Sequence, residues 1–192
     1  MKQLLITGFD PFGGESVNPA WEAVKLLPDT IGEYVLCKLE IPTVFGLGAT
    51  AVLEKAAQIQ PDGILCIGQA GGRAAVTPER IAVNIRDAKI ADNVGNQPQG
   101  EFVDKSGPAA YFSTLPVMAM AQAIRDAGLP GTVSNSAGAF VCNDTLYTLL
   151  HRYAGTSTRV GFIHVPYLPQ QGTPNLPLAD TVRALEAAIS AI

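Results

Sequence analysis

Short apolar runs alternate along this chain with segments whose apolar residues recur at helical spacing. The run from Gly63 to Ile67 (GILCI) lies between a Pro-Asp pair and a glycine, which is typical of a buried strand. Residues Ala49 to Gln60 have helical periodicity and stop at Pro61. Alternation of this kind favours a layered fold in which helices cover both faces of a mostly parallel sheet.

The same patterns predict the remaining elements. Strands are predicted over Gln3 to Thr7, Tyr34 to Ile41, Gly63 to Ile67, Glu79 to Ile85, Gly131 to Ser134 and Arg159 to Val165. Helices are predicted from Pro19 onward, over Ala49 to Gln60, Pro116 to Gly128, Asn143 to Tyr153 and Leu178 to Ile192. Asn18 before Pro19 suits a helix start, since asparagine caps and proline fits the first turn. With no repeat or linker, we expect one α/β domain over residues 1–192, a three-layer α/β/α sandwich.

Composition and charge exclude several classes of protein. Of 192 residues, 47 % are hydrophobic and 16 % charged, which excludes a disordered chain. The net charge is −4 and no Lys/Arg run occurs, so nucleic acids and anionic membranes are not expected partners. The first apolar stretch is too short for a signal peptide, and no run approaches the ~20 apolar residues of a membrane span. We therefore expect a cytoplasmic protein.

A long polar stretch interrupts the pattern at residues 87–114. It contains the string DNVGNQPQG and shows neither helical nor strand periodicity. Loops of this length in a compact domain are often functional or lie at an interface. The sequence leaves open whether residues 87–112 form a lid or a subunit contact.

The reactive side chains are few: three cysteines and two histidines. No C-x-x-C or H-x-x-x-H pair occurs, so no metal site is expected. An odd cysteine count at wide spacing favours reduced thiols over disulfides. Cys37 and Cys66 lie inside predicted strands, where a free cysteine usually acts as a small buried hydrophobe.

Cys142 lies where a glycine-containing turn passes into a helix. The positive end of a helix favours the thiolate, and the free N–H groups there could hold an oxyanion. An inert cysteine remains an equal alternative. His151 is nine residues further along the same helix, about 13 Å away, which is beyond hydrogen-bond reach. His164 ends a predicted strand, where sites gather in α/β sheets, so we expect it to meet Cys142. A third group, chosen from 17 carboxylates, stays open at this point.

Six strings of residues resemble the pyroglutamyl peptidase I (pyrrolidone carboxyl peptidase) family of cysteine peptidases. They are GFDPFGGESVNP, IGQAGGRAAVTPERIAVN, DNVGNQP, GPAAYFSTLP, SNSAGAFVCN and GFIHVPY, in the family's order over nearly the whole chain. The resemblance implies a cytoplasmic α/β/α hydrolase that removes N-terminal pyroglutamyl residues from peptides. It implies no metal or other cofactor, and a homo-oligomer, either a tetramer or a dimer.

The resemblance also assigns roles to individual residues. It implies that Cys142 in FVCN is the nucleophile and that His164 in FIHVPY is the general base. It adds Glu79 in PERIAVN as the group that orients His164. The alternative for Glu79 is a strand-edge carboxylate paired with Arg80 or Arg73.

The resemblance further implies a small, largely apolar pocket for a lactam ring. Phe9 and Phe12 would sandwich the ring. The other residues in strings that line the family's site are Asn18, Gln69, Phe140 and Val141. The alternatives for GFDPFGG are a turn whose aromatic residues pack in the core, or a phosphate loop, although no G-x-x-x-x-G-K-[ST] occurs.

This chain departs from the family pattern at two positions. Lys89 replaces an arginine that would support the oxyanion, and lysine lacks the planar fork of arginine. Ala139 replaces a threonine, and the chain is also shorter after Tyr167. Two rival functions are a catalytically silent ligand-binding relative and a phosphorylase-like transferase. The sequence contains no basic cluster that could bind phosphate, which argues against the transferase.

Overall fold

A six-stranded, mostly parallel sheet forms the centre of the protein. The computed structural model describes all 192 residues. The strands run in the order β2 (Thr30–Ile31), β3 (Tyr34–Ile41), β1 (Lys2–Phe9), β4 (Gly63–Gln69), β8 (Arg159–Val165) and β5 (Thr77–Pro78). The four central strands are parallel, and the two short edge strands are antiparallel to their neighbours. A separate antiparallel pair is formed by β6 (Ile81–Val83) and β7 (Ala110–Phe112).

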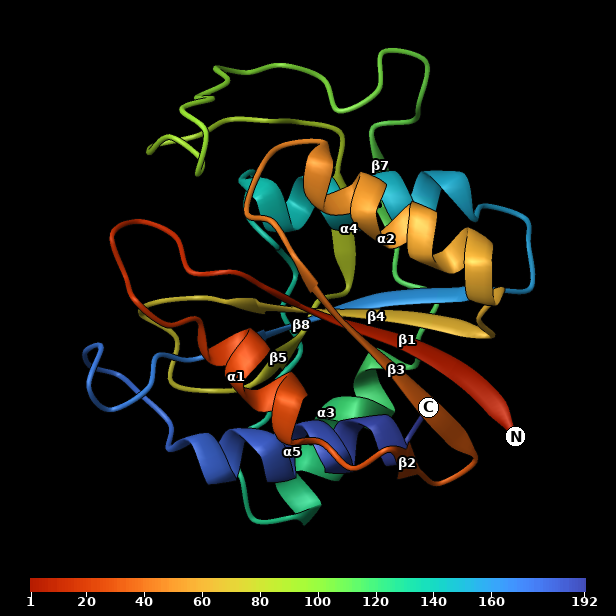
Figure 1. Cartoon of the computed structure of the whole chain (residues 1–192), viewed down its shortest axis with the longest axis vertical. Coiled ribbons are helices and arrows are strands. Elements are labelled where there is room, and N and C mark those ends of the chain that lie inside the picture. Colours follow the sequence, from red (N-terminus) through yellow and green to blue (C-terminus); the bar gives the residue numbers. More distant parts are fainter.

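Five helices cover the two faces of this sheet (Figure 1). One face carries α2 (Leu47–Ile59) and α4 (Val141–Arg152). The opposite face carries α1 (Pro19–Leu26), α3 (Val117–Asp126) and α5 (Leu178–Ser190). The predicted three-layer α/β/α architecture is therefore confirmed.

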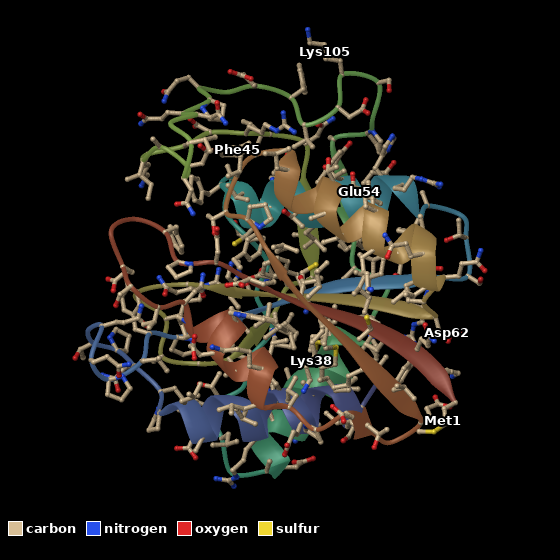
Figure 2. All side chains as sticks on the ribbon, in the orientation of Figure 1. Met1, Lys38, Phe45, Glu54, Asp62 and Lys105 are labelled. Atoms are coloured by element: carbon tan, nitrogen blue, oxygen red, sulfur yellow. The ribbon has the colours of Figure 1, made fainter.

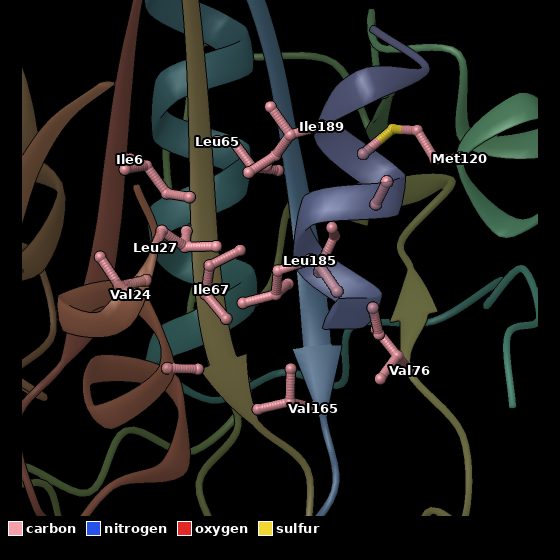
Figure 3. Close-up of a cluster of buried hydrophobic side chains, with 14 of the residues drawn as sticks. Ile6, Val24, Leu27, Leu65, Ile67, Val76, Met120, Val165, Leu185 and Ile189 are labelled. Carbon is pink, nitrogen blue, oxygen red and sulfur yellow. The ribbon is translucent and has the colours of Figure 1, made fainter. Parts of the chain in front are cut away.

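The pleat of the strands divides the apolar side chains between two cores. Along β1, Leu4 and Ile6 face the layer of α1, α3 and α5, while Leu5 faces α2 and α4. Figure 3 shows part of the first core, where Leu65 and Ile67 of β4 lie close to side chains of α1 and α5. Helices bury the side chains on both faces of the sheet, which explains why the central strands consist of nearly continuous apolar residues.

Most predicted elements occur near their predicted positions. β3 and β8 have the predicted bounds, and α1 begins at Pro19 with Asn18 as its cap, whose Oδ1 accepts a hydrogen bond from the Ala20 N–H at 3.0 Å. Two predictions are wrong. The strand predicted over Glu79 to Ile85 is broken, because the chain leaves the main sheet after Glu79 and pairs with β7 instead. The strand predicted over Gly131 to Ser134 is reduced to single bridges, Val76 with Gly131 and Glu79 with Ser134.

The long polar stretch crosses the outer side of the α2 and α4 layer (Figure 1). Between Asn84 and Ala109 it forms only one bridge, between Arg86 and Glu101. Asp92 fixes its tip by accepting hydrogen bonds from the N–H of Phe45 at 3.0 Å and of Asn96 at 2.8 Å. Phe45, labelled in Figure 2, lies where the stretch passes the start of α2. The segment is thus held against the domain by hydrogen bonds.

None of the five helices combines the length and the apolar character needed to cross a membrane.

Candidate active site

The pleat of β8 places His164 on the side of α4. Phe162, two residues earlier, packs in the core beneath α2 and α4, so His164 faces the same way. The His164 side chain lies at the carboxyl end of the strand and is only 4 % exposed. Its ring lies 4.8 Å from the Phe162 ring, centroid to centroid. The strand therefore fixes both the position and the direction of this imidazole.

Cys142 approaches the same strand pair from the helix above it. It is the second residue of α4, and neither its N–H nor that of Val141 bonds to a backbone carbonyl. Its Sγ lies over Gly68 of β4, since a Cβ added at Gly68 would be 2.9 Å from the sulfur. Gly68 is the register partner of His164. Absence of a side chain at Gly68 thus lets the thiol reach the level of the imidazole.

Glu79 completes a line of three groups. Its Oε1 lies 2.7 Å from Nδ1 of His164, and the Glu79 side chain is fully buried. The same oxygen accepts a hydrogen bond from Nη1 of Arg73 at 2.5 Å. Both suggestions made for Glu79 from the sequence therefore hold together: it contacts the histidine and it pairs with Arg73. Arg80, the other suggested partner, lies instead near Met118.

Burial and charge shift the pKa values of Glu79 and His164 in the same direction. Burial raises the pKa of Glu79, but the hydrogen bond and charge of His164, helped by Arg73, hold that pKa below its ordinary value. Burial lowers the pKa of His164 below its ordinary value, and the hydrogen bond to Glu79 only partly opposes this. The carboxylate is therefore ionised and the imidazole is neutral near pH 7.

The thiol of Cys142 is also neutral in the resting site. Burial raises the pKa of Cys142 to about 12, and the nearby charge of Glu79 acts in the same direction. The positive charge of Arg73 opposes both. The thiolate expected from the position at a helix start is thus outweighed by desolvation. A neutral thiol beside a neutral imidazole requires proton transfer at the moment of attack.

Cys142 and His164 line one cavity of about 260 Å³. Five of the six residues predicted to bind the substrate also line it: Phe9, Phe12, Asn18, Gln69 and Phe140. Val141 is the exception, because its side chain is fully buried in the core beneath α4. Lys89 is exposed on the long polar stretch and does not line the cavity either. The side chains of Val141 and Lys89 therefore lie outside the wall of this cavity, and the roles expected for them stay predictions.

Aromatic rings form much of the cavity wall. Phe12 and Phe140 lie 6.0 Å apart, centroid to centroid, and Phe45 meets Phe140 edge-on at 5.3 Å. Phe9 is buried against Phe162. The rings give an apolar surface that suits a small, uncharged ring.

The amide of Asn18 serves the fold as well as the cavity. Its Nδ2 donates to the Asp10 carbonyl at 3.0 Å, while its Oδ1 caps α1. Asp10 in turn accepts a hydrogen bond from the Thr43 N–H. These contacts anchor the loop that carries Phe12, so Asn18 shapes the wall even where its own polar atoms are occupied.

Sequence reasoning named Arg73 only as a possible partner of Glu79 and missed Gly68. Arg73 lines the cavity and, besides Glu79, donates to Thr77 Oγ1 at 2.6 Å and to the Ser136 carbonyl at 2.9 Å. Gly68 gives the close approach of Cys142. The only signal for either was the glycine-rich string GQAGGR after a buried strand.

His151 lies outside the cavity, as its spacing from Cys142 required. Its Nδ1 lies 2.7 Å from the Tyr111 hydroxyl and its Nε2 lies 3.7 Å from Asp104. It therefore links the last turn of α4 to the long polar stretch. No three side chains of His, Cys, Asp or Glu come together in a way that could hold a metal ion.

Comparison with known proteins agrees with this geometry. The family profile described as pyroglutamyl peptidase matches residues 2–192. The chain is 54 % identical to the pyrrolidone-carboxylate peptidase of Levilactobacillus brevis, over 99 % of this chain and 97 % of that protein. It is 50 % identical to the protein of the same name from Clostridium perfringens, over 99 % and 92 %.

Solved structures give the same result. The crystal structure of Bacillus amyloliquefaciens pyroglutamyl peptidase I matches with a TM-score of 0.96 and 44 % identity, over 100 % of this chain and 96 % of that one. The pyrrolidone carboxyl peptidase of Thermococcus litoralis matches with a TM-score of 0.94 and 37 % identity, over 100 % and 93 %. By sequence and by fold along its whole length, this chain belongs to the pyroglutamyl peptidase family.

Proposed function

We propose that this protein is a cysteine peptidase that removes N-terminal pyroglutamyl residues from peptides. The observation that carries the proposal is the Glu79–His164 contact of 2.7 Å at a cavity that Cys142 also lines. Nδ1 of His164 faces the carboxylate, so the other ring nitrogen is free to exchange a proton with the thiol. Membership of the family supports the choice of substrate.

The first half of the reaction forms a thioester. His164 accepts the proton of Cys142 as the sulfur attacks the carbonyl carbon that joins the pyroglutamyl residue to the next residue. The free N–H groups at the start of α4 are suited to hold the oxyanion. The C–N bond then breaks, and His164 returns the proton to the leaving amine. Glu79 stabilises the charged imidazole between these steps.

The second half releases the product. Water loses a proton to His164 and attacks the thioester carbonyl, after which the C–S bond breaks and the sulfur recovers the proton. Pyroglutamate leaves the cavity. No redox change occurs, and one water molecule is consumed for each peptide bond cleaved.

The cavity wall supports a compact, uncharged group in the acyl site. A pyroglutamyl ring carries no ammonium group, so it needs no carboxylate opposite its nitrogen. Phe9, Phe12 and Phe140 offer apolar surface, and none of the residues that line the cavity is a carboxylate. A free N-terminal amine would lose its hydration here without gaining an ion pair, so ordinary peptides should be rejected.

We further propose a homo-oligomer in the reducing environment of the cytoplasm. The exposed apolar side chains of Ile90, Val94 and Phe102 on the long polar stretch support a subunit contact rather than a lid. The reaction needs a reduced Cys142, and the three cysteines are free. Light scattering after size-exclusion chromatography would show a monomer if the contact is absent.

The test of the function is hydrolysis of a fluorogenic pyroglutamyl amide by the intact protein. Cys142→Ala should abolish turnover, whereas Cys37→Ala, the matched control on β3, should keep it. Prolyl and alanyl amides should be poor substrates. An inactive parent protein that still binds the lactam would favour the silent binding relative, and full activity in Cys142→Ala would refute the assigned nucleophile.

A further inference from the structure

Gln171 reaches the cavity from the segment that follows β8. Its Oε1 accepts a hydrogen bond from the Leu168 N–H at 2.9 Å. A backbone N–H can only donate, so the atom of Gln171 that faces Leu168 must be its oxygen. This contact fixes which end of the Gln171 amide points away from Leu168, and that end is the NH₂ group.

The NH₂ group of Gln171 in turn fixes a residue of the cavity wall. Nε2 donates to Oε1 of Gln69 at 3.0 Å and to the Val17 carbonyl at 3.4 Å. Both acceptors agree with the orientation that Leu168 imposes. The oxygen of Gln69 is thereby occupied, while its own NH₂ group has no hydrogen-bond partner in the protein. Gln69 lines the cavity, so the unpartnered end is a donor available to a ligand.

We propose that Gln171 is a positioning residue that sets the polarity of Gln69, so that the cavity presents an N–H donor to the ring oxygen of the bound acyl group. This inference rests on the proposed function and adds how the site selects a lactam. An amide side chain can turn either end to a ligand. The relay of hydrogen bonds from Leu168 through Gln171 to Gln69 fixes the orientation of the Gln69 amide before the substrate arrives. This lowers the free-energy cost of ordering that side chain on binding.

The first test replaces Gln171 by methionine, which has a similar length and no donor. Gln171→Met should raise KM for a pyroglutamyl amide about five- to tenfold, the value of one well-placed hydrogen bond, with kcat nearly unchanged. The matched control is Gln170→Met, because Gln170 is the exposed neighbour and makes no side-chain hydrogen bond. A KM within twofold of the parent value in Gln171→Met would overturn the proposal.

A second variant reverses the polarity instead of removing it. In Gln171→Glu one carboxylate oxygen still accepts from Leu168, and the other takes the place of the donor facing Gln69. Gln69 should then turn its NH₂ group toward Glu and its oxygen toward the cavity. The rise in KM should exceed that of Gln171→Met, and a smaller rise would contradict the relay.

A binding measurement separates this proposal from the proposed function. Iodoacetamide should alkylate Cys142 at the cavity, and 2-pyrrolidinone, a bare lactam, should slow that reaction by occupying the cavity. Without lactam, the alkylation rates of the two Gln171 variants should equal that of the parent, and thermal melts should show that both variants are folded, with somewhat lower melting temperatures because of the lost hydrogen bonds. The half-protecting lactam concentration should rise about five- to tenfold in Gln171→Met. Unchanged protection would refute the relay, whether or not the parent protein turns over peptides.

Discussion

At the scale of single residues, one oxygen atom organises the site. Oε1 of Glu79 accepts hydrogen bonds from both His164 and Arg73, while the fully buried Oε2 has no hydrogen-bond partner. An unsatisfied buried carboxylate oxygen is costly, and native structures contain few of them. The negative charge of Glu79 is therefore stabilised at the oxygen that His164 and Arg73 share.

Glu79→Gln should therefore impair the reaction more than the fold. Without the carboxylate, the charged imidazole loses its stabilising partner, and kcat should fall about a hundredfold or more. The pKa of His164, already lowered by burial, should fall further because Glu79 no longer opposes the effect. The base works when neutral, so the acidic limb of the pH–rate profile should move to lower pH. Glu54→Gln, an exposed carboxylate on α2, is the control, and an unshifted limb in Glu79→Gln would speak against this role.

Gly68→Ala should show whether the close approach of Cys142 to β4 is needed for activity in a protein that still folds. The added Cβ would lie 2.9 Å from Sγ of Cys142 and 2.7 Å from the Phe162 ring, so the thiol and the ring must shift to make room. We expect a loss of kcat and slower alkylation of Cys142. Circular dichroism should show that the sheet is retained. Parent-like kcat in a folded Gly68→Ala protein would mean that the thiol tolerates the displacement.

Only part of the site could be predicted from the sequence without the family resemblance. Cys142 and His164 could be found because the chain has so few thiols and imidazoles. Glu79 required the family resemblance, since it lies 85 residues from His164 and one carboxylate among 17 carries no local signature. Arg73 could be named only as one possible partner of Glu79, and Gln171 acts through contacts that exist only after folding, so no sequence pattern marks it.

At the scale of elements, α4 is held in place by a buried ion pair in its first turn. Asp144, fully buried, accepts from Nε of Arg86 at 2.6 Å and from the Gly46 N–H at 2.8 Å. Asn143 next to it bonds the N–H and carbonyl of Val83. The start of α4, and with it Cys142, is thus tied to the long polar stretch and to the start of α2.

Arg86→Met should destabilise the protein by about 3 kcal/mol, because it leaves the Asp144 carboxylate buried without its charged partner. Urea denaturation would measure the loss. The same replacement in an Asp144→Asn background should cost far less, since no buried charge remains to be paired. Equal costs in the two backgrounds would show that the two side chains are not coupled.

Elements with strong periodicity were predicted closely, and short ones were not. β3 and β8 are eight- and seven-residue strands whose apolar runs are bounded by turns. β2 and β7 have two and three residues, too few for a pattern to emerge. The break after Glu79 depends on pairing with β7, where Ile81 lies opposite Phe112, and local propensity does not reflect so distant a partner.

At the scale of the whole molecule, the site makes stability depend on pH. The pKa of His164 is lower in the folded protein than its ordinary value of 6.5, because burial disfavours the charged ring. Below pH 6.5 the unfolded chain therefore binds a proton that the folded protein excludes. Stability is complete above this pH and is lost as the pH falls toward the folded pKa.

The free energy of unfolding should decrease between pH 6.5 and pH 5, with a slope of up to about 1.4 kcal/mol per pH unit. Glu79 adds a loss of the same sign at lower pH, since its folded pKa lies below its ordinary value. Urea denaturation across this range should show the slope in the parent protein and in His151→Gln, the matched control. His164→Gln should lack it, and a slope that persists there would assign the effect to other groups.

The position of β8 in the sheet has a consequence for synthesis on the ribosome. This strand inserts between β4 and β5 although it is the last strand made, and it carries His164, the imidazole of the site. An emerging chain therefore holds its thiol and its carboxylate before it has a base to join them. Until the sheet closes, the thiol has no imidazole in place to accept its proton. Enzymatic activity therefore requires the central sheet to be complete.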